Sequence, residues 1–132
     1  MSSPGHGDVL VADGDPAIRS LLSVLVKRMS RRAVPAPDCA TALQLLETHE
    51  FDGAVIDLRL PSDDGTEVLP ALAARVPEML PHVVVITTAK WRPDGDLKPV
   101  AAVLRKPFAL DELTEALESC CRETPSSAGD SR

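Results

Sequence analysis

The sequence has few aromatic side chains and no excess of positive charge. Aromatic residues make up 2% of its 132 residues, and tyrosine is absent. Proteins that bind nucleic acids commonly stack bases on aromatic rings and neutralise phosphates with Lys and Arg. Here 14 Lys and Arg face 20 Asp and Glu, which gives a net charge of −6. The composition therefore argues against a nucleic-acid partner.

Cysteine is also scarce, and no apolar run is long. The three cysteines, Cys39, Cys120 and Cys121, form no CxxC pair. We therefore expect neither a disulfide framework nor a zinc site, which suits a cytoplasmic protein. No run approaches the roughly 20 apolar residues of a membrane-spanning helix, and residues 1–7 lack the pattern of a secretory signal. We expect no membrane insertion.

What remains is the composition of an ordinary globular domain. Hydrophobic residues account for 44% of the chain and charged residues for 26%, both close to the average for folded proteins. We expect one domain over residues 8–122. The small, polar segments 1–7 and 123–132 are predicted to be disordered tails.

Short apolar runs alternate with helical patterns along the chain. The clearest runs span residues 9–12, 54–56, 83–86 and 101–104, and a weaker one spans 33–34. Strands that alternate with helices form parallel βαβ units, covered by helices on both faces. The pattern therefore predicts an α/β fold: a three-layer, doubly wound, five-stranded parallel sheet.

The segment between the last two apolar runs does not suit a regular helix. Pro93, Gly95 and Pro99 fall within seven residues of one another. Proline interrupts the hydrogen bonds of a helix interior, and glycine weakens it. We therefore expect the fourth helix of the domain, within 88–99, to be shortened or irregular.

Polar residues mark the carboxyl ends of four predicted strands. The first strand ends at Asp13 and the third at Asp57. The fourth strand ends at Thr87, and the fifth runs into Lys106. Parallel strands bring these ends to one edge of the sheet, where ligands bind. Two acids placed together repel each other, and Mg²⁺ bound by their oxygens would relieve the repulsion. One carboxylate is then a candidate nucleophile towards phosphorus, with the ammonium and hydroxyl groups holding the phosphoryl oxygens.

These residues and their order resemble the receiver domain of two-component response regulators. The matching segments are residues 9–13 with Pro16, residues 55–61 with Gly65, Thr87, and residues 106–108. They span about Asp8 to Arg122, nearly the whole chain. The resemblance implies the flavodoxin-like fold, with strand order 2-1-3-4-5.

The resemblance also implies a function and a role for each site residue. Asp57 would accept a phosphoryl group from a histidine kinase or phosphotransfer protein. Asp13, Asp57 and the backbone carbonyl of Arg59 would hold Mg²⁺. Thr87 would move towards the phosphoryl group, and Lys106, before a cis-proline bond, would ion-pair with it. The chain would then be a stand-alone receiver that signals through a downstream protein partner, and not an enzyme beyond its own phosphotransfer.

Three positions depart from the family pattern. Gly14 stands where receivers carry a second acid, so Mg²⁺ binding is expected to be weakened. Asp15 either compensates through a water molecule or serves only as the N-cap of the following helix. Val103 replaces the aromatic residue that reports phosphorylation in the family. Thr88 is larger than the usual Ala or Gly and would narrow access to the phosphoacceptor.

Two other functions are consistent with the sequence. Gly14 and Val103 favour a pseudo-receiver, which keeps the fold as an interaction module without using phosphorylation. Alternatively, Asp13-Gly14-Asp15 resembles the DxD motif of haloacid-dehalogenase-like phosphatases. In that case Asp13 would be the nucleophile and Asp15 the general acid, although the chain is short for that fold.

Overall fold

The computed structural model describes residues 7–88 and 100–121, which form a five-stranded parallel sheet. The strand order is β2-β1-β3-β4-β5, as predicted. The strands are β1 (Asp8–Ala12), β2 (Arg32–Ala36), β3 (Gly53–Asp57), β4 (Val83–Thr88) and β5 (Ala102–Lys106). Because β1 and β3 are direct neighbours, the residues that follow them lie side by side at one edge.

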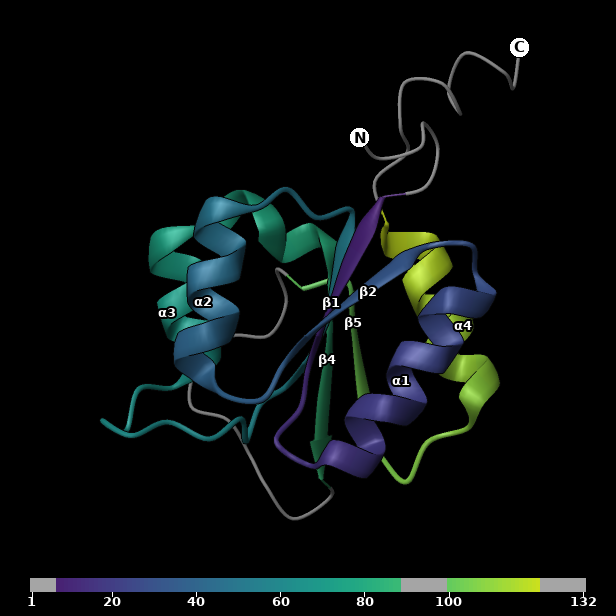
Figure 1. Ribbon diagram of the computed structural model, residues 1–132, viewed down its shortest axis with the longest axis horizontal. Coiled ribbons are helices and arrows are strands. Elements are labelled where there is room, and N and C mark those ends of the chain that lie inside the picture. The colour runs from purple at the N-terminus through teal and green to yellow at the C-terminus, as the bar shows by residue number, and fades with distance from the viewer. Residues whose placement is uncertain (1–6, 89–99, 122–132) are drawn as a thin grey trace, which may run out of the picture.

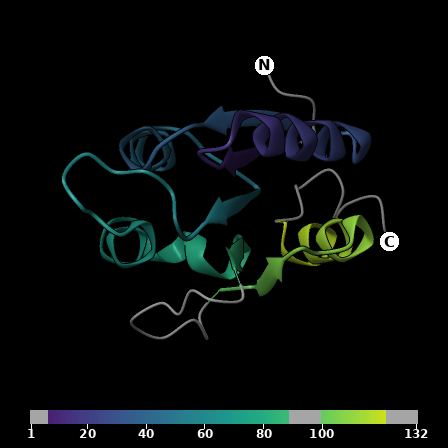
Figure 2. The same cartoon turned by 90° about the horizontal axis from the view of Figure 1, so that it is seen from below.

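Helices cover both faces of this sheet. They are α1 (Pro16–Arg28), α2 (Cys39–Thr48), α3 (Val68–Arg75), the short 3₁₀ helix η1 (Pro77–His82) and α4 (Leu110–Cys120). Figures 1 and 2 show α1 and α4 on one face, and α2 and α3 on the other. The predicted three-layer, doubly wound α/β arrangement is confirmed.

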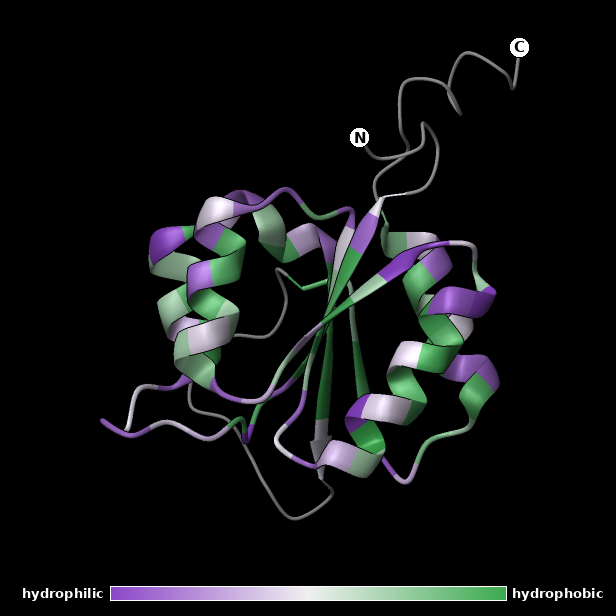
Figure 3. Cartoon of the chain, in the orientation of Figure 1, coloured by the Kyte–Doolittle hydropathy of each residue, from purple (hydrophilic) through white to green (hydrophobic). Residues whose placement is uncertain are grey.

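The sheet has a separate hydrophobic core on each face. Successive residues of a strand point to opposite faces, so Val9 and Val11 pack towards α1 and α4, while Leu10 and Ala12 pack towards α2 and α3. All four are fully buried. Figure 3 shows the central strands as largely hydrophobic, in agreement with their buried residues. This explains why the sequence shows apolar runs, rather than alternation, at the strands.

Aspartate side chains begin the first two helices. The carboxylate of Asp15 accepts a hydrogen bond from Ala17 N at 2.9 Å, and Pro16 is the first helical residue. The carboxylate of Asp38 accepts one from Thr41 N at 2.8 Å. Each bond satisfies a backbone N–H that the helix itself leaves free.

Some element boundaries differ from the sequence-based expectation. Strand β5 continues to Lys106 because Arg105 pairs with Thr87 in the ladder, and backbone pairing does not depend on side-chain polarity. Residues 77–82 form an unpredicted 3₁₀ helix, in which Pro81 has no N–H to continue a regular ladder.

Several expectations concern residues that the structure does not describe. The shortened fourth helix and the two tails fall almost entirely on residues 1–6, 89–99 and 122–132. Between these gaps, the predicted cis bond is present between Lys106 and Pro107. No helix in the described part of the chain has the length and apolar character needed to cross a bilayer.

Candidate functional site

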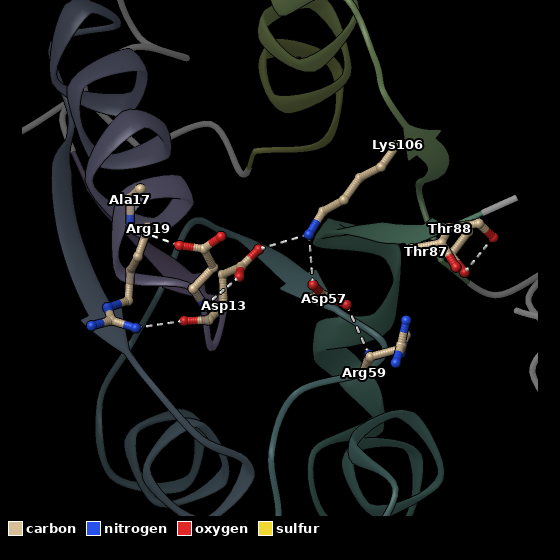
Figure 4. Close-up of polar contacts among 9 residues, drawn as sticks. Asp13, Ala17, Arg19, Asp57, Arg59, Thr87, Thr88 and Lys106 are labelled. Atoms are coloured by element: carbon tan, nitrogen blue, oxygen red, sulfur yellow. Dashed lines mark hydrogen bonds and ion pairs between the residues drawn. The ribbon is translucent and has the colours of Figure 1, made fainter. Parts of the chain in front are cut away.

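The carboxyl edge of the sheet brings two acids and one lysine together. Asp13 follows β1, Asp57 ends β3, and Lys106 ends β5 (Figure 4). The ammonium nitrogen of Lys106 lies 2.9 Å from Asp57 Oδ2 and 3.4 Å from Asp13 Oδ2. Because β4 separates β3 from β5, the long lysine side chain must extend across a neighbouring strand to reach both carboxylates.

The carboxylate of Asp57 is oriented by the turn that follows it. Its Oδ1 accepts a hydrogen bond from Arg59 N at 2.8 Å, and its backbone carbonyl accepts one from Leu60 N at 3.1 Å. Asp57 therefore keeps one oxygen on the loop and presents the other to Lys106. The side chain is 12% exposed, so it lies at the surface of the core. The expected part of the Arg59 carbonyl in Mg²⁺ binding stays a prediction.

Asp13 is more deeply buried and is held from several sides. Its side chain is 2% exposed, and Oδ1 accepts a hydrogen bond from Asp15 N at 2.9 Å. Its backbone carbonyl accepts one from the guanidinium of Arg19 at 2.7 Å. The sequence analysis missed Arg19, although its spacing of six residues from Asp13 places it on the first turns of α1.

The three charges do not balance. Burial raises the pKa of Asp13, and the nearby charge of Asp57 adds to this effect, while Lys106 and the Asp15 amide oppose it. Burial acts to lower the pKa of Lys106, but its hydrogen bonds to both acids and their charges outweigh burial and raise it. Two carboxylates sharing one ammonium leave one negative charge in excess, which favours a further cation.

The donor set fits Mg²⁺. Asp13 and Asp57 supply hard carboxylate oxygens, and Mg²⁺ often binds only one or two carboxylates while keeping several waters. No cluster of three or more potential His, Cys, Asp or Glu ligands occurs within residues 7–88 and 100–121. Asp15 uses a carboxylate oxygen to cap α1, so its part in metal binding stays a prediction.

Gly14 is enclosed by a proline. A Cβ atom at Gly14 would lie 2.7 Å from Cδ and 2.8 Å from Cγ of Pro61. Pro61 is itself anchored, because its carbonyl accepts a hydrogen bond from Cys39 N at 2.7 Å. Any side chain at position 14 therefore requires the proline to move. The absence of a second acid at position 14 is therefore tied to the close approach of Pro61. No short-range sequence pattern reveals that contact.

The structure does not bring Thr87 to the charged groups. Its hydroxyl lies 3.4 Å from the carbonyl oxygen of Thr88, and its side chain lies apart from Asp57 and Lys106 (Figure 4). Thr87 is buried at the end of β4. Its expected movement towards a phosphoryl group stays a prediction, as does the effect of Thr88 on access.

The sequence itself identifies the family. Residues 9–118 match the family described as the response regulator receiver domain. The chain belongs to this family. Receiver domains are signalling phosphoacceptors that bind Mg²⁺ at an acidic site. In this receiver domain, the acids at the carboxyl edge of the sheet are Asp13 and Asp57.

Known relatives agree with this assignment. The transcriptional regulatory protein FixJ of Bradyrhizobium diazoefficiens is 30% identical over 97% of this chain and 62% of that protein. The chain spans about half the length of the curated relatives it matches.

Solved receiver domains share the fold. One, from a Francisella response regulator, is 25% identical with a TM-score of 0.72, over 89% of this chain and 96% of that chain. Another, from a sensor histidine kinase of Pseudomonas aeruginosa, has a magnesium ion coordinated in its active site cleft. It is 22% identical with a TM-score of 0.68, over 87% of this chain and 97% of that chain.

Proposed function

We propose that this receiver domain accepts a phosphoryl group on Asp57 from a histidine kinase or phosphotransfer protein. Its output is read by a downstream protein partner, and it is not an enzyme beyond its own phosphotransfer. The observation that carries the proposal is the contact of Lys106 with both Asp57 and Asp13, at 2.9 Å and 3.4 Å. The meeting of two carboxylates and an ammonium at one edge of the sheet supports roles for them as nucleophile, cation-binding acid and phosphoryl partner.

The transfer requires positioning and charge neutralisation more than proton transfer. An Asp57 carboxylate oxygen forms a bond to phosphorus while the P–N bond to the donor histidine breaks, and the imidazole leaves. The Arg59 amide holds the other carboxylate oxygen in place. The ammonium of Lys106 neutralises the incoming phosphoryl oxygens, since it already lies beside the acceptor.

Asp13 and Asp57 would hold Mg²⁺, with the Arg59 carbonyl as a further ligand. When bound, Mg²⁺ supplies positive charge that offsets the repulsion between the acids and the phosphoryl group. The magnesium in the cleft of the P. aeruginosa receiver domain supports this assignment. The enclosed Gly14 leaves this site one acid short, so we expect weaker Mg²⁺ binding than in receivers with two adjacent acids.

The pseudo-receiver is the second candidate, and one contact favours it. Pro61 fills the place of a side chain at Gly14, which weakens the metal site on which phosphotransfer depends. The phosphatase hypothesis receives less support. It needs Asp15 as a free general acid, yet that carboxylate caps α1.

A labelling experiment separates the three functions. The protein is incubated with Mg²⁺ and a small phosphodonor such as acetyl phosphate, and its intact mass is measured. We expect one added phosphoryl group in the wild type and in the Asp63→Asn control, whose aspartate lies exposed in the loop after β3. Asp57→Asn should carry none.

Each other outcome favours an alternative. No labelling by any donor or by the cognate kinase would favour the pseudo-receiver. Turnover of a phosphoester that needs Asp13 but survives Asp57→Asn would favour the phosphatase. Equal labelling of Asp57→Asn and wild type would contradict the proposed acceptor.

A further inference from the structure

Two adjacent thiols lie at the end of the molecule opposite the phosphoacceptor. Cys120 ends α4, and Cys121 follows it. Figure 1 shows the yellow end of α4 on the side where β1 begins, whereas Asp57 lies at the carboxyl edge. Cys120 is buried and Cys121 is partly exposed.

Both sulfur atoms converge on the backbone of Gly53, the first residue of β3. A Cβ atom there would lie 2.8 Å from Cys121 Sγ and 3.7 Å from Cys120 Sγ. The glycine therefore makes room for the sulfurs. Cys120 Sγ also donates a hydrogen bond to the carbonyl of His82 at 3.4 Å, and the Cys120 carbonyl lies 2.7 Å from Nδ1 of His82. These contacts fix where the end of α4 meets the sheet.

The surroundings favour a reactive thiolate on the partly exposed cysteine. The neighbouring Cys120 thiol and the charge of Arg31 lower the pKa of Cys121, although burial and the charges of Asp52 and Glu118 oppose them. The same coupling and burial raise the pKa of Cys120. These shifts make Cys121 the thiol of the pair that ionises first.

A direct disulfide between these cysteines is disfavoured. Consecutive Cα atoms lie about 3.8 Å apart. Disulfides normally join Cα atoms roughly 4.4–6.8 Å apart, so an adjacent pair closes a strained, easily reduced ring. A single atom inserted between the two sulfurs avoids that strain. Soft thiolates prefer soft, thiophilic centres.

We propose that Cys120 and Cys121 form a vicinal dithiol site for a trivalent arsenical of the type R–As=O. Two S–As bonds form, the As=O bond breaks, and the oxygen leaves as water with the two thiol protons. Arsenic and sulfur keep their oxidation states, so no oxidant or reductant is needed. The site uses none of the phosphoacceptor residues and goes beyond the proposed function.

Zinc suits this place less well. Structural zinc sites are almost always four-coordinate, with Cys, His or carboxylate ligands. Within residues 7–88 and 100–121 no group of three such side chains gathers around a common point. A metalloid that is satisfied by two sulfurs and its own organic group fits the pair better.

To test this proposal, the full chain is incubated with phenylarsine oxide and its intact mass is then measured. We expect one adduct that survives 2-mercaptoethanol but is released by 2,3-dimercaptopropanol, because only a second dithiol competes with a two-sulfur chelate. Cys121→Ser and Cys120→Ser should each lose the monothiol-resistant adduct. Cys39→Ala, which removes the buried cysteine of α2, should keep it.

A fourth variant guards against loss of structure in the cysteine variants. Gly53→Ala retains all three thiols but places a methyl group against Cys121 Sγ, and should capture the arsenical about ten-fold more slowly. Thermal melts of every variant confirm folding. A resistant adduct in Cys120→Ser or Cys121→Ser, its loss in Cys39→Ala, wild-type capture by Gly53→Ala, or no adduct on the wild type would each overturn the proposal.

Discussion

The two ends of strand β1 each carry a buried aspartate, yet their surroundings differ. Asp8 begins the strand, and its Oδ2 lies 3.0 Å from the guanidinium of Arg32 and 2.6 Å from Nε2 of His49. Asp13 follows the strand and shares the ammonium of Lys106 with a second acid. Asp8 Oδ2 therefore has two partners of its own, although Asp8 Oδ1 is buried without a hydrogen bond, whereas Asp13 shares one ammonium with a second acid.

Neighbouring pairs reinforce this difference. At the amino edge, Arg31 and Asp52 form a second ion pair at 2.7 Å, so two arginines face two aspartates. At the carboxyl edge, two aspartates face one lysine. At the amino edge, the ion pairs between residues of this chain stabilise the fold. The carboxyl edge keeps one negative charge in excess, which favours an added cation such as the proposed Mg²⁺.

The largest expected effect is loss of the shared ammonium. Lys106→Met leaves two carboxylates facing each other without a cation, so we expect the free energy of unfolding to fall by about 2 kcal/mol. This loss is smaller than that for breaking a fully buried ion pair, because the Lys106 side chain is 27% exposed. Added Mg²⁺ should restore part of the loss. Denaturant unfolding at pH 7, with and without Mg²⁺, measures both.

Arg32→Met at the amino edge is the matched control. Its side chain is 70% exposed, and exposed ion pairs contribute about 0.5 kcal/mol. Equal losses for the two variants would remove the distinction between the edges.

The next effect concerns the packing of Gly14. Gly14→Asp alone drives its Cβ into the ring of Pro61, and we expect overpacking to cost about 1.5 kcal/mol. Combining it with Pro61→Ala should recover most of this stability and bind Mg²⁺ more tightly than the wild type. Unfolding curves and Mg²⁺ titrations followed by thermal shift test both parts. A fully stable single variant would show that the proline is not a barrier.

Neutralising the aspartate at each end of β1 should change the free energy of unfolding in opposite directions. Because the pKa of Asp13 is raised above 3.8 in the folded state, the stability linked to its protonation is present below pH 3.8 and lost as pH rises through the folded pKa. Asp13→Asn should therefore stabilise the protein at pH 7, by on the order of 1 kcal/mol. This gain should vanish below pH 3.8.

Asp8→Asn is the counterpart at the amino edge. It removes the negative charge that pairs with the Arg32 guanidinium and leaves His49 beside a neutral amide, so we expect a loss of about 1 kcal/mol at pH 7. The unfolding free energies of both variants are measured between pH 3 and pH 7, a range that includes the ordinary carboxyl pKa of 3.8. Two changes of the same sign at pH 7 would contradict the comparison.

The smallest effect resolves the role of Asp15. Asp15→Ala should cost about 0.5 kcal/mol, because it removes the N-cap of α1. If Asp15 only caps the helix, the Mg²⁺ titration of this variant will match that of the wild type. A several-fold weaker affinity would assign Asp15 to the metal site as well.

Local patterns were sufficient to predict the sheet and its charged edge. The apolar runs predicted the strands, and Asp15 was one candidate for the N-cap of the first helix. The rule that parallel strands share a carboxyl edge then predicted that Asp13, Asp57 and Lys106 would meet. These inferences needed only short-range sequence patterns and one general property of α/β folds.

Contacts between distant segments could not be predicted in the same way. Pro61 meets Gly14, and Gly53 meets Cys121, only after the helices have packed on the sheet. The pairing of Asp8 with His49 joins residues 41 positions apart. No spacing rule connects such residues, so their contacts required the structure.

The central claim is that Asp57 is the phosphoacceptor, and localisation of the phosphoryl group tests it most directly. Borohydride reduces an aspartyl-phosphate to the alcohol and so converts that aspartate into homoserine. After labelling in the presence of Mg²⁺ and reduction, peptide mass spectrometry should find homoserine at position 57 and aspartate at position 13. Homoserine at position 13, or at no position in a protein that carries the phosphoryl group, would contradict the account.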